Sequence, residues 1–159
     1  MNYILPCLYA FGASFAFAIV FNIQRNKLLL SALGGMLGQL AFVVFLNVLS
    51  NQAASYMLAT IAIALYAEVM ARLTKSPTTI YLAVALIPLV PGGGIYYTML
   101  YFINGDIELG ASTGIETLLI SGALAVGIIM VSSTVNLVRK VMLKSKARMG
   151  KKYPYGKKN

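Results

Sequence analysis

The residues best suited to chemistry interrupt an apolar run between Pro88 and Gly94. Pro88 and Pro91 lack the N–H that a helix needs, and their rings press on the preceding turn, so a regular helix cannot continue through them. The residues after Pro91 permit backbone conformations that a side chain would forbid; they are Gly92, Gly93 and Gly94. Carbonyl groups freed before the break can coordinate a cation, and N–H groups that open the second half-helix can hold a carboxylate. We therefore predict that Pro88, Pro91 and the glycines bind substrate.

Two tyrosines directly after the break extend this candidate site. Tyr96 and Tyr97 can present hydroxyl groups toward a pathway, whereas Tyr101, on the same helix face as Tyr97, suits the outer interfacial belt of a membrane protein. We include Tyr96 and Tyr97 among the substrate-binding candidates. The alternative for the whole break is a proline kink that only shapes helix packing, although three consecutive glycines exceed what a kink requires.

Two acidic residues within apolar segments are candidates for carrying a coupling proton. Glu68 lies near the end of an apolar run, and Arg72 is placed one helical turn later, where it can pair with Glu68. Glu116 lies near the beginning of the last apolar run, where an acidic side chain also favours a helix N-terminus. A structural role therefore competes with proton coupling at both positions.

The composition excludes histidine-based chemistry. The chain contains no histidine, and its one cysteine, Cys7, lies in the first apolar run. Neither a histidine-based metal site nor a histidine-dependent catalytic triad can form within it. We expect no metal and no cofactor, and we do not expect an enzyme, because no nucleophile–base pair is apparent.

The low charge identifies an integral membrane protein, since 59% of the residues are hydrophobic and only 11% are charged. We predict an all-α fold with five transmembrane helices, the fourth of which is broken. The predicted spans are residues 3–21, 28–49, 54–71, 78–103 and 113–138, with a polar loop at 104–112 and a basic tail at 139–159.

A signal peptide is the alternative interpretation of the first apolar run, but no Lys or Arg precedes that run. About 13 residues lie on each side of Pro91, at about 1.5 Å each, which places the break near the bilayer midplane.

The distribution of basic residues predicts the orientation. Nine of the 13 Lys and Arg residues lie from Arg139 onward, which indicates a topological signal more than a surface for nucleic acid. With five crossings, every Lys and Arg falls on one side of the membrane. The positive-inside rule then places the C-terminus in the cytoplasm and the N-terminus outside. The basic tail is too polar to fold alone.

Several segments together resemble the threonine/serine exporter family, and more closely the small membrane subunit of its split members. They are Phe21-Asn22, Ala71-Arg72, Lys75-Ser76-Pro77, the run from Ile87 to Gly92, and Tyr96. The resemblance extends from about Phe11 to Val138. It implies export of small amino acids or, in some relatives, a dicarboxylate. It also implies a larger partner subunit, because the chain resembles only the C-terminal half of full-length members.

The function we predict is a subunit of a secondary-active exporter in a bacterial cytoplasmic membrane. Its substrate is a small carboxylate, either threonine and serine or a dicarboxylate such as succinate. Its partners are the lipid bilayer and the larger membrane subunit, with no nucleic acid. The alternative is a non-transporting scaffold that stabilises or localises a partner. A channel is a third class, but five spans make a thin pore unless the chain oligomerises.

Overall fold

The computed structural model describes residues 4–152, with side chains described for residues 4–142. Over this range the chain is helical, without a strand, as the sequence predicted. The helices are α1 (Ile4–Val20), α2 (Arg25–Leu49), α3 (Gln52–Thr74), α4 (Thr78–Leu86), the short 3₁₀ helix η1 (Ile87–Leu89), α5 (Gly92–Ile103) and α6 (Ile107–Lys152).

Three helices are long and apolar enough to cross a bilayer, namely α2, α3 and the Ile107–Met142 part of α6. The pair formed by α4–η1 and α5 is a fourth candidate if it forms one bent span. Helix α1 is apolar but has only 17 residues, the lower end of the length that crosses a bilayer. The chain is thus a multi-pass membrane protein with three or four candidate spans, and a fifth crossing by α1 stays a prediction.

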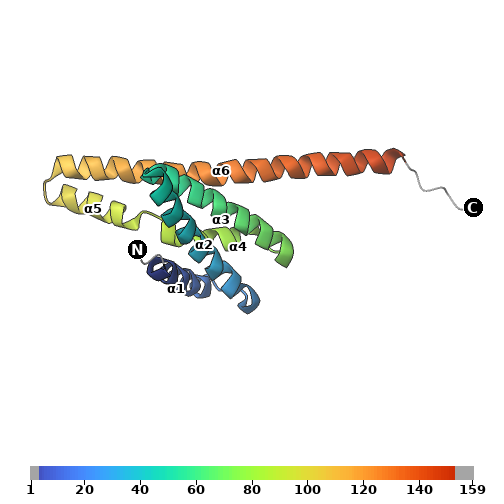
Figure 1. Cartoon of the computed structure of the whole chain (residues 1–159), viewed down its shortest axis with the longest axis horizontal. Helices are drawn as coiled ribbons and strands as arrows, with labels where there is room; N and C mark the ends of the chain where they lie inside the picture. The colour runs from blue at the N-terminus through green and yellow to red at the C-terminus, as the bar shows by residue number, and fades with distance from the viewer. Residues whose placement is uncertain (1–3, 153–159) are drawn as a thin grey trace, which may run out of the picture.

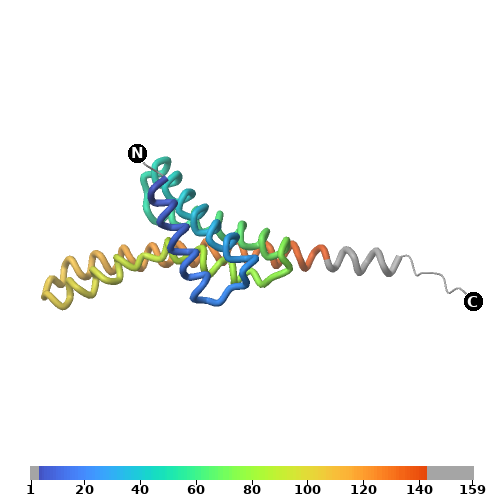
Figure 2. Tube along the Cα trace, turned by 90° about the horizontal axis from the view of Figure 1, so that it is seen from below, coloured from blue at the N-terminus to red at the C-terminus, as the bar shows by residue number. Residues whose placement is uncertain are grey.

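Helices α1–α4 form a bundle that packs against the middle of the long helix α6 through α3, with α1 on the side away from α6, while α5 and the first part of α6 form a hairpin (Figure 1). The perpendicular view shows the same hairpin projecting away from the other helices (Figure 2). No residue of α5 is buried, in contrast to every other α-helix of the bundle. The fold therefore consists of a packed bundle and a projecting arm, joined at the break before α5.

Glycines on α2 hold the bundle together by letting three neighbouring helices approach closely. A Cβ on Gly35 would meet Ser14 of α1, one on Gly34 would meet Ala85 of α4, and one on Gly38 would meet Ile63 of α3. The predicted close approach at Gly34 and Gly38 is confirmed. In lipid, where apolar burial gives little driving force, such contacts supply the packing attraction.

Small and aliphatic residues fill the two cores between these helices. The larger core consists of Ala59, Ile63, Ala85, Leu89 and Leu124. Leu89 belongs to η1, so the bundle anchors the N-terminal side of the break. A second cluster, formed by Ala67, Ala71 and Tyr81, packs the end of α3 against α4.

The two ends of α6 differ most from the boundaries that the sequence predicted, while α2 and α3 differ by two or three residues. Helix α6 begins at Ile107, so most of the predicted loop 104–112 is helical. The connection from α5 is short because Gly105 and Asp106 already complete the turn. Helix α6 also continues to Lys152, so the first part of the predicted tail is helical as an extension of α6 and not as a unit that folds alone. A helix that is already nucleated propagates readily through Lys, Arg, Met and Leu. Residues 153–159 lie outside the described range.

The contact between α1 and α2 gives a test of the packing. We expect Gly35→Ala to lower the free energy of unfolding by about 1–3 kcal/mol, because the new methyl group overlaps Ser14. Gly122→Ala is the matched control, since its Cβ would meet nothing within 4 Å. Thermal unfolding in detergent should show a lower midpoint for Gly35→Ala only. Equal midpoints for the two variants would contradict the close approach of α1 and α2.

Candidate functional site

The break predicted from the sequence is present, and its geometry follows from the two prolines. Helix α4 ends at Leu86 and η1 carries Pro88, after which Val90 is extended with φ −62° and ψ 128°. Helix α5 then begins at Gly92, with its axis bent by 49° from that of the preceding helix. The sequence therefore correctly located the interruption, while its depth in the bilayer stays a prediction.

Two amide groups at the start of α5 are left without a backbone acceptor. The N–H of Gly92 donates to the carbonyl of Val90 at 2.7 Å, and the N–H of Ile95 donates to the carbonyl of Pro91 at 3.2 Å. Between them, the N–H groups of Gly93 and Gly94 find no acceptor in Val90 or Pro91. Unpaired donors with the positive end of the helix dipole behind them favour an anion.

Open space adjoins these donors on one side. A Cβ added to Gly92 or Gly93 would meet no atom within 4 Å, and both residues are exposed. Gly94 instead packs against Thr117 of α6. The Thr117 hydroxyl donates to the carbonyl of Thr113 at 2.7 Å, which leaves its oxygen able to accept. The predicted glycines thus form an accessible patch of backbone with one polar side chain beside it.

Along the arm, a glycine of one helix faces a larger side chain of the other helix at three successive levels. Gly94 contacts Thr117, Gly114 lies about one turn farther and contacts Thr98, and Gly110 contacts the ring of Phe102. At Gly114 a Cβ would lie 3.2 Å from the Thr98 methyl group, so the helices touch closely. These three levels set the register between α5 and α6.

That register places Glu116 beside the break, because its neighbour Thr117 contacts Gly94. Helix α6 begins earlier than predicted, so Glu116 is about 14 Å along the helix from Ile107 and not at the helix start. Glu116 is therefore not a residue of the helix N-terminus, while its position near the outer end of the span stays a prediction. Its side chain is exposed on the arm.

The tyrosines after the break form a ladder on α5. The ring centroids of Tyr96 and Tyr97 lie 5.3 Å apart, edge to face, and those of Tyr97 and Tyr101 lie 6.3 Å apart. The prediction that Tyr97 and Tyr101 share a face is confirmed. Tyr96 and Tyr97 are 62% and 52% exposed, so neither side chain is buried within the bundle.

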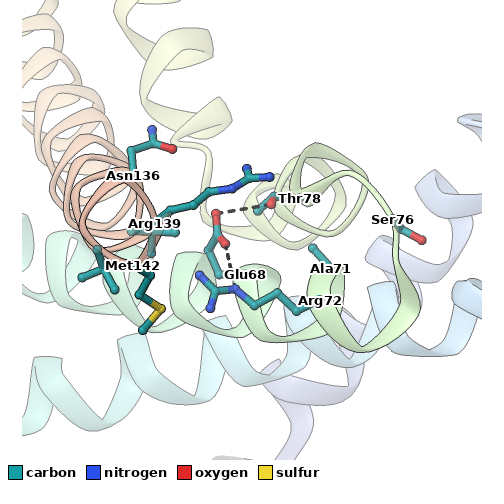
Figure 3. Close-up of a pocket in the computed structure, with 10 residues that line it drawn as sticks. Glu68, Ala71, Arg72, Ser76, Thr78, Asn136, Arg139 and Met142 are labelled. Carbon is teal, nitrogen blue, oxygen red and sulfur yellow. Dashed lines mark hydrogen bonds and ion pairs between the residues drawn. The ribbon is translucent and has the colours of Figure 1, made fainter. Parts of the chain in front are cut away.

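Glu68 occupies a different place, a cavity of about 450 Å³ between the end of α3, the start of α4 and α6 (Figure 3). Its carboxylate accepts a hydrogen bond from the Thr78 hydroxyl at 3.3 Å. The Nε of Arg72 lies 3.8 Å from its other oxygen, as the spacing predicted. No residue from Pro88 to Tyr97 lines this cavity. The two acidic candidates therefore belong to separate sites.

The comparison with family models decides the class of protein. The model described as "Threonine/Serine exporter, ThrE" matches residues 6–134. The chain belongs to this exporter family. The match includes the bundle, the break and the arm of this ThrE-family chain. No curated protein and no solved structure shows significant similarity to it.

Sequence reasoning missed part of the polar cavity in this ThrE-family chain. Asn136 and Arg139 of α6 line it together with Thr78, although Arg139 was predicted only to be the first residue of the tail. Their spacing of three residues places both on one helix face. Nothing in that spacing indicates which neighbouring helix they meet, so the cavity could be found only once the fold was known.

Accessibility to water distinguishes a binding site from a buried kink. In a chain in which Cys7 is replaced by Ser, we expect Gly93→Cys to react with a membrane-impermeant, charged thiol reagent. Gly122→Cys should react far more slowly, because a thiol in lipid is protonated and the reagent does not enter. Both positions have open space for a side chain. Labelling followed by mass spectrometry measures the rates, and equal rates would contradict a hydrated break.

Proposed function

We propose that the chain is a subunit of a secondary-active exporter that binds the substrate's carboxylate at the start of α5. The observation that carries this proposal is the pair of unpaired N–H groups at Gly93 and Gly94, next to open space. Family membership supports threonine and serine as substrates. A dicarboxylate such as succinate fits the same donors.

The physical basis is the electrostatics of a helix N-terminus in an apolar surrounding. A carboxylate there gains roughly 0.3–1 kcal/mol from the dipole, and up to about 2 kcal/mol where it is partly buried. Hydrogen bonds to a charged acceptor add about 1.5–3 kcal/mol. The Thr117 hydroxyl and the Tyr96 and Tyr97 hydroxyls supply further groups for the remainder of the substrate. This proposal keeps Pro88 and Pro91 as residues that shape the site.

Glu116 is the better supported of the two proton-coupling candidates. Coupling requires that proton binding and substrate binding influence each other. Glu116 lies at the level of Gly94, whereas Glu68 lies in a cavity that no residue of the break lines. An exposed carboxylate within an apolar segment is also unfavourable in lipid, which favours contact with water or protein.

The exposed arm supports a larger partner subunit. Helix α5 has no buried residue, and Tyr96, Tyr97 and Glu116 present polar groups that lipid cannot satisfy. A second membrane subunit seated against the arm would close the site from the open side. With the positive-inside rule, the assembly would lie in a bacterial cytoplasmic membrane with the N-terminus outside and the C-terminus inside.

Efflux measurements test the substrate site. Cells that lack the chain are complemented with the wild type, Gly93→Leu or Gly122→Leu, with the partner subunit present, and loaded with labelled threonine, serine or succinate. Gly93→Leu fills the open space and should lower substrate affinity by about ten- to hundredfold, because it displaces charge-assisted hydrogen bonds. Gly122→Leu should transport normally. Co-purification of the partner with both variants controls for assembly.

The same measurement separates export from a scaffold role. The alternative function, a non-transporting scaffold, is favoured by the exposure of the arm, since a scaffold also needs a large docking face. A scaffold would retain efflux in Gly93→Leu as long as the complex assembles. Unchanged efflux of all three substrates in cells without the chain would contradict the exporter proposal itself.

Proton coupling is tested at Glu116. We expect Glu116→Gln to abolish the acceleration of efflux by an inward proton gradient, because a neutral amide cannot take up or release a proton. Exchange of labelled for unlabelled substrate should continue, since it needs no net proton movement. Glu108→Gln, in the exposed first turn of α6, is the matched control. Retained acceleration in Glu116→Gln would assign the coupling proton elsewhere.

A further inference from the structure

The cavity around Glu68 is separate from the break and contains a charge arrangement of its own. Three elements enclose it, since Glu68 and Arg72 come from α3, Thr78 from the start of α4, and Asn136 and Arg139 from α6. Its volume of about 450 Å³ lies within the range of about 300–1,000 Å³ that is typical of small-molecule sites. Ala71, Val135, Val138 and Met142 supply apolar walls.

Arg139 is the cation of this cavity without an acidic partner. Among the side chains that the structure describes, the one ion pair is Arg72 with Glu68. Arg139 extends from α6 across the cavity toward Thr78, with the Glu68 carboxylate next to it (Figure 3). Two guanidinium groups therefore face one carboxylate, and the lining side chains within residues 4–142 carry one net positive charge.

Glu68 is held loosely enough to accept a second cation. Its contact with Arg72 is 3.8 Å long, and the Arg72 side chain is 62% exposed, so this pair contributes little to stability. Glu68 itself is 22% exposed, and the Thr78 hydroxyl orients one of its oxygens at 3.3 Å. A positioned carboxylate with a weak partner can exchange that partner for a ligand ammonium group.

We propose that this cavity binds the zwitterionic head of an α-amino acid, with the ligand carboxylate on Arg139 and its ammonium group on Glu68. The inference rests on the proposed export of amino acids and adds a second site, where substrate binds at the basic end of the bundle before it reaches the break. The Asn136 amide can donate to the ligand carboxylate, and the Thr78 oxygen, whose hydrogen is donated to Glu68, can accept from a hydroxyl on the ligand side chain.

The charges favour an amino acid over a dicarboxylate. A zwitterion carries no net charge, and its ammonium and carboxylate groups complement the Glu68 carboxylate and the unpaired Arg139 guanidinium. A dicarboxylate would place its second carboxylate next to Glu68, where like charges repel. Arg139 suits the role because a guanidinium can bind a carboxylate through two parallel hydrogen bonds. The cavity would therefore act as a selectivity step that the backbone donors at the break cannot provide.

Equilibrium binding of labelled L-threonine and succinate to the purified protein in lipid nanodiscs tests this site. The full chain, with its partner where the two co-purify, carries Gly93→Leu so that binding at the break is weakened and the cavity dominates the signal. On this background we expect Arg139→Gln to weaken threonine binding about tenfold, as loss of one charge-assisted contact implies. Lys140→Gln removes the same charge from the next residue, which does not line the cavity, and should bind threonine normally.

The Glu68→Gln variant identifies the ligand class. It should weaken threonine binding and strengthen succinate binding, because the ammonium partner and the like-charge repulsion disappear together. Size-exclusion chromatography checks that Arg139→Gln elutes as the wild type does. If it does not, Arg139→Lys serves as the second variant, and it should retain threonine binding in part because it keeps the charge. Equal threonine binding by Arg139→Gln and Lys140→Gln would overturn the proposal, as would loss of all binding in Gly93→Leu alone.

The outcomes also separate this inference from the proposed function. If wild-type cells export threonine and Arg139→Gln does not change threonine binding, the cavity is not a substrate site although the exporter function stands. If no export occurs while the cavity binds threonine as described, the exporter proposal fails and the binding site remains.

Discussion

Unpaired backbone amides in an apolar segment are the constraint on which the rest of this fold depends. Within a bilayer each unsatisfied N–H costs several kcal/mol, so a helix is interrupted only where protein, water or ligand replaces the missing bonds. Pro88 and Pro91 create such an interruption, and Gly93 and Gly94 carry the unpaired donors. Their environment decides whether the break is a defect or a binding site.

Close contacts between small residues keep this environment in place. The glycines of α2 bring α1, α3 and α4 together, and Leu89 of η1 lies in the resulting core. On the other side of the break, α5 contacts α6 through Gly94, Gly110 and Gly114. One half of the broken helix is thus fixed in the bundle and the other in the arm.

Much of this could be predicted from residue types alone. The apolar runs, the interruption at Pro88–Gly94, the pair between Glu68 and Arg72 and the close approach at Gly34 and Gly38 all depend on local spacing, and the structure contains each of them. The sequence did not predict that Glu116 lies at the level of Gly94, because this depends on where α6 begins and on its register with α5. The cavity around Arg139 was missed because its residues come from three helices.

The sequence by itself determined that the chain is helical, resides in a membrane and breaks one helix at two prolines. These properties follow from hydropathy, from the missing proline N–H and from the freedom of glycine, all of which act within a few residues. Only the tertiary structure decided that Glu116 lies beside the break, that Glu68 faces Arg139 and Thr78 instead, and that α5 projects from the bundle. Those facts depend on which faces of distant helices meet, and packing between helices sets that choice.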